Sequence, residues 1–317
     1  MRDVLRRLVA GELSEEDALA ELRRMQLDEL GGRARLDLGR YLRRGIPEVV
    51  LAAGKSPQDA ARLAIALAER QGQGLISRMT DAHRSALREA AQRAGMRIVE
   101  YHAAARVVRE GFSPESLDAK VGILTAGTSD LSAADEARMV VEACGLEARL
   151  EADLGVAGLH RFVGPLAAVL EWGADVVIVA AGMDGVLPGL VAGLIELPVI
   201  GLPVSTGYGR GGAGEAALTT MLQSCSTGLT VVNIDNGVGA GAAATLIAAR
   251  VAQGRRRGRS TATTASTMAP TSIKPKTAAA ITREASAPPG TAKTSASKPT
   301  ATRTAASSHG KPRRRRP

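Results

Sequence analysis

Residues 175–202 read DVVIVAAGMDGVLPGLVAGLIELPVIGL, and this stretch decides the fold. Asp175–Ala180 and Pro198–Leu202 form short apolar runs, which are typical of strands covered on both faces. The segment between them carries glycines, and Pro188 suits a first helical turn. The stretch therefore predicts a strand, a helix and a second strand parallel to the first.

The segments on either side of this stretch extend the same pattern. Further strands are predicted at Val121–Leu124, Glu147–Leu150 and Leu229–Ile234. Right-handed crossovers place every strand-to-helix loop at one edge of such a sheet, where ligands bind in open α/β proteins. The predicted fold class is therefore α/β, a three-layer sandwich with a parallel sheet between helices.

A smaller α/β domain is predicted before this sheet. Ser14-Glu15-Glu16-Asp17 is a helix-capping sequence, and we expect the helical segment to continue through Arg44. The periodicity then predicts strands and helices in alternation, at Glu48–Leu51, Pro57–Glu69, Gly74–Arg78, Asp81–Ala94 and Arg97–Tyr101. Because Gly111–Ser116 is a turn-rich boundary, we expect a helical and small α/β domain over 1–116 and a catalytic domain over 117–252.

The net charge of +9 is concentrated at one end of the 317-residue chain. Residues 251–317 hold 15 Lys and Arg and one acidic residue, whereas residues 1–250 hold 26 basic and 31 acidic residues, a net charge of −5. The basic segment is rich in Thr, Ala, Ser and Pro, so we expect residues 253–317 to be a disordered tail. Such a tail could bind nucleic acid or another polyanion, or it could serve only as a solubilising extension.

The composition is that of a globular protein of the cytoplasm. Hydrophobic residues make up 45% and aromatic residues 2%, so Ala, Val, Leu and Ile must build the core. Two cysteines are too few for a disulfide framework, which fits a reducing compartment. The charged N-terminal segment does not resemble a signal peptide, and prolines interrupt the most membrane-like run, Val186–Val204. We therefore expect no membrane segment.

The loop Thr125–Asp130, after the first strand of the second domain, is a candidate phosphate site. Its small residues permit close approach of a ligand, and the N-terminus of the following helix favours an anion. Ser129 or Asp130 also fits the simpler role of a helix cap. The candidate ligand-binding residues in this loop are Gly127, Thr128, Ser129 and Asp130.

The loop after the third strand of that domain places a lone carboxylate, Asp184, at the end of an apolar run. Asp184 fits either a helix cap or a general base whose pKa is raised by a dry pocket. The neighbouring residues Gly182 and Met183 are candidate substrate contacts.

Two other segments supply candidate ligand contacts. Pro203–Gly214 is a long glycine-rich loop, typical of a lid or binding element, and its candidates are Ser205 and Tyr208. Lys55, in the first domain, fits either an anion contact or a solvated side chain.

The two cysteines differ in their surroundings. Cys144 lies in a helical pattern and fits packing, whereas Cys225 lies among hydroxyls and glycine and fits either a buried side chain or a nucleophile. After the last strand, Asn233, Asp235 and Asn236 fit either ligand contact or a capped turn.

Five segments together resemble the LarB family of nickel-pincer cofactor biosynthesis proteins. They are RRGIPEVVLAAGKSP, VGILTAGTSDL, VVIVAAGMDGVLPGLVAGL, PVIGLPVSTGYG and MLQSCSTGLTVVNIDNGVGA. The similarity covers nearly all of residues 30–245. The second domain of that family resembles the PurE-type aminoimidazole ribonucleotide carboxylases, which implies a PurE-like or flavodoxin-like sheet.

The resemblance implies carboxylation of the pyridinium ring of nicotinic acid adenine dinucleotide, with hydrolysis of its phosphoanhydride. The products are pyridinium-3,5-biscarboxylic acid mononucleotide and AMP. A cysteine attacks the ring in that family, and Cys225 matches it. The carboxylate of the third loop is usually glutamate in that family; here it is Asp184, the candidate base.

Cofactor and partner expectations follow from this chemistry. Because the thiolate activates the ring, no biotin, flavin or ATP is expected. Mg²⁺ or another divalent cation would neutralise the diphosphate, with Asp235 and Asn236 as candidate ligands. The substrates would be the dinucleotide and CO₂ or bicarbonate, and we expect a homo-oligomer.

Two alternatives stay open, one a second enzyme and the other a binding module. One is a carboxylase or mutase of the PurE type, which is disfavoured because Val186 occupies the position of its catalytic histidine. The other is a nucleotide-binding regulatory module that the basic tail tethers to polyanions.

Overall fold

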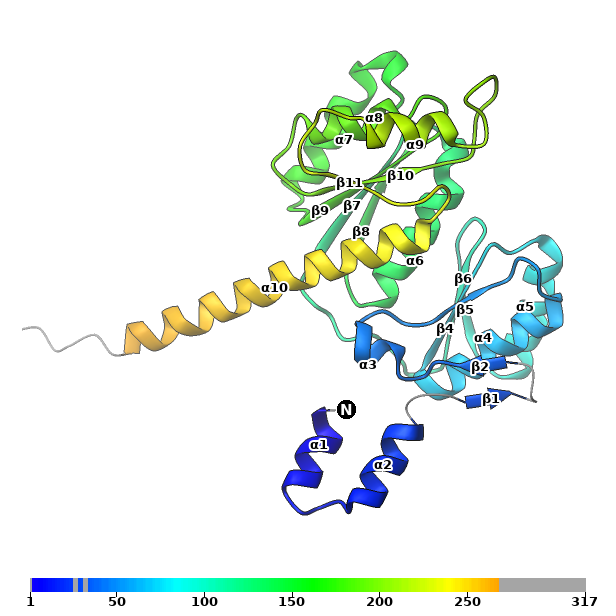
Figure 1. Ribbon diagram of the computed structural model, residues 1–317, viewed down its shortest axis with the longest axis vertical. Helices are drawn as coiled ribbons and strands as arrows, with labels where there is room; N and C mark the ends of the chain where they lie inside the picture. Colours follow the sequence, from blue (N-terminus) through cyan, green and yellow to red (C-terminus); the bar gives the residue numbers. More distant parts are fainter. Residues whose placement is uncertain (1, 25–27, 31–33, 268–317) are drawn as a thin grey trace, which may run out of the picture. The chain divides into compact units, whose positions relative to one another are not determined.

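The structure is a computed structural model that describes residues 2–24, 28–30 and 34–267. All of these residues belong to one compact unit, which contains a larger and a smaller sheet with their helices (Figure 1). Residues 268–317, most of the predicted basic tail, lie outside the described residues. The expected disorder and polyanion contact of that segment stay predictions.

The larger sheet has five strands in the order β11-β10-β9-β7-β8. In chain order they are β7 (Lys120–Thr125), β8 (Glu147–Glu151), β9 (Val176–Ala181), β10 (Val199–Pro203) and β11 (Leu229–Val231). Every neighbouring pair is parallel. The predicted parallel sheet is therefore confirmed, although β11 ends before the predicted Ile234.

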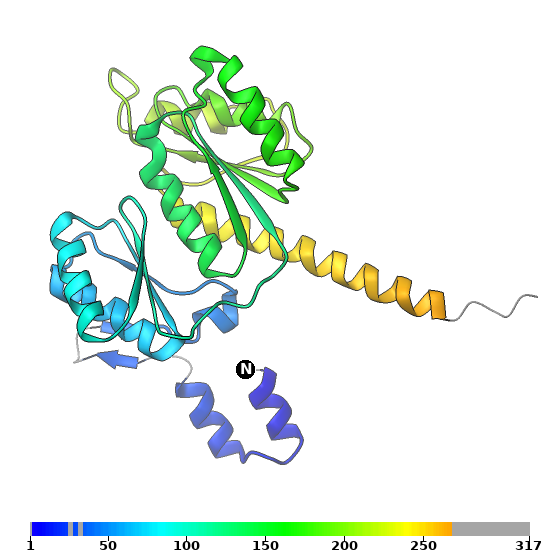
Figure 2. The ribbon, with the colours of Figure 1, turned by 180° about the vertical axis from the view of Figure 1, so that it is seen from behind.

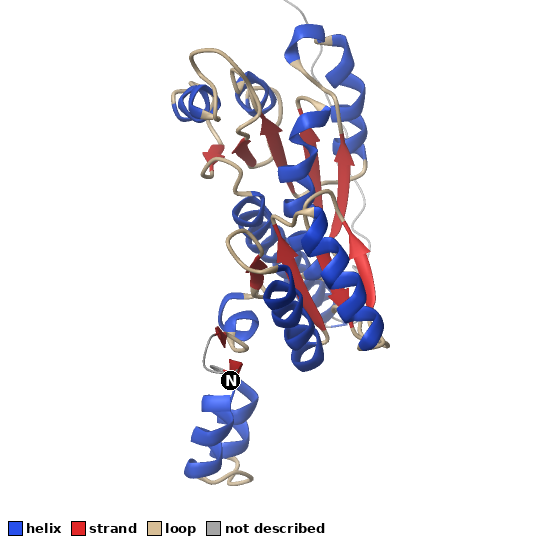
Figure 3. Cartoon of the chain, turned by 90° about the vertical axis from the view of Figure 1, so that its right-hand side faces the viewer, coloured by secondary structure: helices blue, strands red, loops and turns tan. Residues whose placement is uncertain are grey.

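Helices cover both faces of this sheet, as Figures 2 and 3 show. Successive residues of β9 point to opposite faces, so that Val176 and Ile178 pack in one buried cluster and Val177 and Val179 in another. The helices are α6 (Leu131–Ala143) and α10 (Gly237–Thr267) on the first face, and α7 (His160–Glu171), α8 (Val186–Ala192) and α9 (Glu215–Leu222) on the second. This is the predicted three-layer sandwich.

Close packing of α6 against α10 depends on small residues. Ala240, Ala244 and Ala248 of α10 are fully buried. A Cβ atom added at Gly241 would lie 2.5 Å from the Ala137 carbonyl oxygen. Small residues therefore let the two helix backbones approach each other within one chain.

The smaller sheet has four strands in the order β3-β4-β6-β5. β3 pairs parallel to β4, whereas β6 pairs antiparallel to both β4 and β5. The elements are β3 (Val49–Leu51), α4 (Pro57–Gln71), β4 (Gln73–Ser77), α5 (Asp81–Arg93), β5 (Arg97–Glu100) and β6 (Ala105–Val108). The sequence predicts all of these except β6, whose Arg106 interrupts an otherwise apolar run.

The prediction of continuous helix through Arg44 is wrong. The chain forms α1 (Arg2–Val9), α2 (Glu15–Arg24), the antiparallel pair β1 (Asp28–Leu30) and β2 (Ala34–Leu36), and α3 (Arg40–Arg44). The cap at Ser14 is confirmed, because its Oγ accepts a hydrogen bond from the Asp17 N–H at 3.0 Å. The Gly31-Gly32 pair in the sequence is a hairpin signal that outweighs the helical periodicity around it.

Helix α10 continues through Thr267 and so includes residues 253–267, the start of the predicted tail. Arg255 forms an ion pair of 2.8 Å with the buried carboxylate of Asp175, and Arg256 donates to the Ser116 carbonyl. These contacts, with the good helix propensity of Gln253 and Arg255–Arg257, favour helix in the first turns past Ala252. The chain's described helices include none long and apolar enough to cross a membrane.

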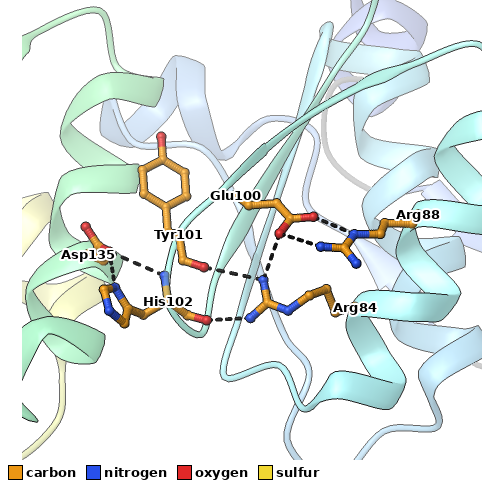
Figure 4. A network of polar contacts seen from close by, with 6 residues as sticks. All are labelled: Arg84, Arg88, Glu100, Tyr101, His102 and Asp135. Carbon is orange, nitrogen blue, oxygen red and sulfur yellow. Dashed lines mark hydrogen bonds and ion pairs between the residues drawn. The ribbon is translucent and has the colours of Figure 1, made fainter.

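The turn between β5 and β6 contacts α6 through polar groups (Figure 4). The Nδ1 atom of His102 lies 2.6 Å from a carboxylate oxygen of Asp135, and the Tyr101 hydroxyl donates to Glu142 at 2.7 Å. Leu75 and Tyr101 also belong to the same buried cluster as α6 and α10. The smaller sheet is therefore packed against the helix layer of the larger one.

Candidate active site

A cavity of about 490 Å³ lies at the carboxyl ends of β7, β9 and β10. This is the edge that the crossover rule predicts for a ligand. Seven of the predicted site residues line it: Gly127, Ser129, Asp130, Gly182, Met183, Asp184 and Tyr208. The loop after β8, residues 155–157, also lines the cavity and was not predicted from the sequence.

Asp130 is the buried carboxylate of this cavity. One of its oxygens accepts from the Gly127 N–H at 2.8 Å, and the other accepts from the Thr206 hydroxyl at 2.7 Å. Burial raises the pKa of Asp130, an effect opposed by these hydrogen bonds. Asp130 therefore ties the first loop to the glycine-rich loop, and its side chain makes no capping hydrogen bond to α6.

The loop after β9, which contains Gly182, Met183 and Asp184, is held closely against the glycine-rich loop. The Met183 N–H donates to the Thr206 carbonyl at 2.9 Å, and Met183 has a positive φ of 49°. A Cβ atom at Gly182 would lie 2.2 Å from that same carbonyl oxygen. Glycine is therefore required at 182 for the close approach of the two loops.

Asp184 lies on this constrained loop but is exposed. Its carboxylate accepts a long hydrogen bond, 3.4 Å, from the Val186 N–H at the start of α8. None of the described residues covers this loop enough to bury Asp184, so these residues do not form the dry pocket expected around its carboxylate. The capping role is compatible with this geometry.

Cys225 does not line the cavity. It is exposed in the loop before β11, and the neighbouring Ser226 hydroxyl donates to the Gly189 carbonyl at 2.7 Å. The strand register aligns Leu229 with Val199 and Val177, near the amino ends of the strands. Cys225 and Asp184, the two predicted catalytic residues, therefore do not line the same cavity within one chain. Loops before and after a parallel strand lie at opposite edges of the sheet.

Several other predicted contacts also lie outside this cavity. Thr128 and Asn233 are exposed and do not line it, and the Lys55 ammonium donates to the Leu51 carbonyl in the smaller domain. Ser205 lines a second, adjoining cavity. Cys144 is buried, as predicted for packing, and burial raises the pKa of its thiol to about 12.

The candidate metal ligands, Asp235 and Asn236, accept hydrogen bonds from backbone N–H groups of nearby loops and helix. Asp235 accepts from the Ser205 N–H at 2.8 Å, and Asn236 accepts from the Gly239 N–H at 2.9 Å, which caps α10. Within the ranges that the structure describes, no group of three or more His, Cys, Asp or Glu side chains is placed to hold a metal ion. These residues do not form a preformed cation site.

Comparison with known proteins agrees with this architecture. Residues 120–267 match the AIR carboxylase family, and residues 27–111 match the LarB/PurE-like N-terminal domain. The chain is 36% identical over 252 residues to the uncharacterized protein MJ0165 of Methanocaldococcus jannaschii, which covers 78% of this chain and 96% of that protein.

Two PurE-type proteins are also similar to this chain. It is 33% identical over 91 residues to the N5-carboxyaminoimidazole ribonucleotide mutase of Thermotoga maritima, which covers 27% of this chain and 51% of the mutase. A crystal structure of a PurE2 variant from Treponema denticola aligns with a TM-score of 0.33 and 20% identity, over 47% of this chain and 96% of that chain.

The parallel sheet and the domain matches define an α/β enzyme class of the carboxylase or mutase type. The chain belongs to the PurE-like family in which a LarB/PurE-like N-terminal domain precedes an AIR carboxylase domain.

Proposed function

We propose that this chain carboxylates the pyridinium ring of nicotinic acid adenine dinucleotide and hydrolyses its phosphoanhydride, in nickel-pincer cofactor synthesis. One observation carries the proposal: the cavity presents the Asp184 carboxylate together with Val186, the residue at the position of the PurE-type histidine. None of the described residues that line the cavity is a histidine. A reaction that needs a base but no imidazole acid fits this set of groups.

The carbon–carbon bond can form with groups that this chain supplies. A thiolate adds to the ring carbon opposite the nitrogen, and the electron pair moves to the nitrogen to give a neutral dihydropyridine. The unsubstituted meta carbon of this enamine attacks CO₂ and forms the new bond. A base then removes the proton from that carbon, and the thiolate leaves as the aromatic ring is restored.

Asp184 and Cys225 are the residues proposed for these steps. Asp184 lines the cavity and would take the proton, whereas Cys225 would supply the thiolate. Cys225 does not line the cavity of its own chain, and its loop precedes β11 whereas the loop of Asp184 follows β9, in a sheet whose strands are parallel. The cysteine that reaches the cavity would therefore come from a neighbouring copy of the chain, as the expected homo-oligomer allows.

The phosphate of the substrate would bind the first loop. The Gly127 N–H is already engaged by Asp130, whereas Ser129 lines the cavity at the start of the helical segment that leads into α6. A helix N-terminus with small residues favours an anion there. This arrangement would hold the ring near Asp184.

Mass spectrometry of the products tests the proposal. The full chain is incubated with nicotinic acid adenine dinucleotide and ¹³C-bicarbonate, and one labelled carboxyl group is expected in a biscarboxylated mononucleotide, together with AMP. Cys225→Ala should abolish the label, and Asp184→Asn should slow its appearance about a hundredfold. The exposed Asp81→Asn, in the other domain, is the control and should retain turnover. Unlabelled product, or undiminished labelling in Cys225→Ala, would contradict the proposal.

A PurE-type carboxylase or mutase is the second candidate, favoured by the match to the Thermotoga maritima mutase. Turnover of a carboxyaminoimidazole ribonucleotide by the native chain tests it, and Val186→His, which restores the imidazole, should then raise that turnover. Activity of the native chain on that substrate would favour this candidate over the first.

A further inference from the structure

A second cavity, of about 320 Å³, adjoins the candidate active site. It shares Ser129 and Thr206 with the first cavity, so the two lie on either side of these residues. Its other polar lining residues include Arg78 from the smaller domain and Ser132 from α6. The function proposed above uses none of these groups except Ser129.

Arg78 reaches this cavity from the carboxyl end of β4. Its backbone is held in the left-handed region, with φ of 54°, and its Nη2 donates to the Asp235 carbonyl at 2.8 Å. Asp235 in turn accepts from the Ser205 N–H at 2.8 Å. Arg78 also lies beside Glu136, whose pKa is raised by burial and lowered by Arg78. A guanidinium has five N–H donors, so the bond to Asp235 leaves others that can bind phosphate oxygens.

The charge pattern of the cavity fits a nucleotide better than a free anion. Arg78 and the hydroxyls of Ser132 and Ser205 are donors for phosphate, whereas Glu136 and Asp235 are acceptors. Carboxylates in nucleotide sites accept hydrogen bonds from ribose hydroxyls. A ribose phosphate presents hydroxyls to these acceptors and a phosphate to the donors, whereas a phosphate alone presents only the second.

The volumes of the two cavities also suit a dinucleotide, with one nucleotide in each cavity. Each lies within or near the volume range of ordinary small-molecule sites, 300 to 1,000 Å³ as a rough guide. Ser129, at their junction, lies in the loop that leads into the N-terminus of α6, a favourable position for a diphosphate. One nucleotide would then occupy each cavity.

We propose that the second cavity binds the AMP half of the dinucleotide, with Arg78 of the smaller domain contacting its phosphate. This inference rests on the proposed function, because it assigns the second half of that substrate. It gives the N-terminal domain a direct part in choosing a dinucleotide over a mononucleotide.

Calorimetric binding to the full chain tests this inference, with nicotinic acid adenine dinucleotide and nicotinic acid mononucleotide as the two ligands. The native chain should bind the dinucleotide at least tenfold more tightly. Arg78→Ala should weaken dinucleotide binding about tenfold or more, the usual effect of a lost charge-assisted bond, and change mononucleotide binding less than twofold.

Because Arg78 also holds the Asp235 carbonyl, a second variant fills the cavity from its other side. Ser132 is exposed and lines only the second of the two cavities, so Ser132→Phe should also weaken the dinucleotide selectively. Arg62→Ala, an exposed arginine of α4, is the control and should bind both ligands as the native chain does. Equal native affinity for both ligands, or equal weakening of both in the two variants, would overturn the inference.

The two proposals fail in different ways. Arg78-dependent preference for the dinucleotide without carboxylated product would refute the proposed reaction and leave this binding site in place. Labelled product formed with unchanged kcat/KM by Arg78→Ala and Ser132→Phe would refute the binding site and leave the reaction in place.

Discussion

Glu136 is a buried carboxyl group beside Arg78. It is 4% exposed, and burial raises its pKa from 4.5 to about 7, although Arg78 opposes the shift. The folded state therefore holds this proton more tightly than the unfolded state. Its contribution to stability is fully present below pH 4.5 and is lost as the pH rises through about 7.

Glu136→Gln should remove this pH dependence. Relative to the variant, the native chain should lose about 3 kcal/mol of unfolding free energy between pH 4.5 and pH 8, the value of a shift of this size. Urea denaturation at several pH values measures the difference, and Glu110→Gln, at an exposed position, is the control. Parallel stability curves for the native chain and Glu136→Gln would contradict the assignment.

Three residues predicted from loops that follow a strand, Asp130, Gly182 and Asp184, line the cavity, whereas Thr128 and Asn233, from loops of the same kind, do not. Asp130, Gly182 and Asp184 were expected at one sheet edge because the chirality of the crossovers fixes that edge. Cys225 could not be placed in this way, since its loop precedes a strand. Arg78 was also missed as a site residue, because its contact with Asp235 spans 157 residues and depends on domain packing.

The close packing of α6 against α10 should make the chain sensitive to an added methyl group at Gly241. Gly241→Ala would place a methyl group against the Ala137 backbone, so the helices must separate, at a cost of about 1–3 kcal/mol. Gly254 lies in the same helix with no atom within 4 Å of an added Cβ. Gly254→Ala should leave stability unchanged or raise it by up to about 1 kcal/mol, through helix propensity. Thermal unfolding of the two variants compares these effects, and equal stability would contradict this account of the packing.

Elements with a strong hydrophobic pattern were predicted most accurately. β9 and β10 are buried at every position, so their apolar runs carry an unambiguous signal. The pair β1 and β2 was missed because three-residue strands, Asp28–Leu30 and Ala34–Leu36, are too short to establish a period. Short strands depend on their pairing partner, which local sequence does not specify.

We expect the proposed reaction to use residues of more than one chain. Asp184 lines a cavity at one edge of the sheet, whereas Cys225 lies in an exposed loop nearer the other. An oligomer in which one copy's Cys225 loop covers another copy's cavity would join the two groups and exclude water. Symmetric homo-oligomers commonly build sites from residues of neighbouring copies in this way.

Mixed oligomers test this claim most directly. Cys225→Ala and Asp184→Asn chains with different affinity tags are co-expressed, and oligomers that carry both tags are assayed for ¹³C-bicarbonate incorporation. If each site combines residues of two copies, random assembly should restore about a quarter of the native activity per site, because each native residue is present half the time. Oligomers of Cys225→Ala alone should stay inactive, and those of Asp184→Asn alone should keep about a hundredth of the native activity. Failure of the isolated mixed oligomers to regain activity would contradict the account, since it would mean that both groups act from the same chain.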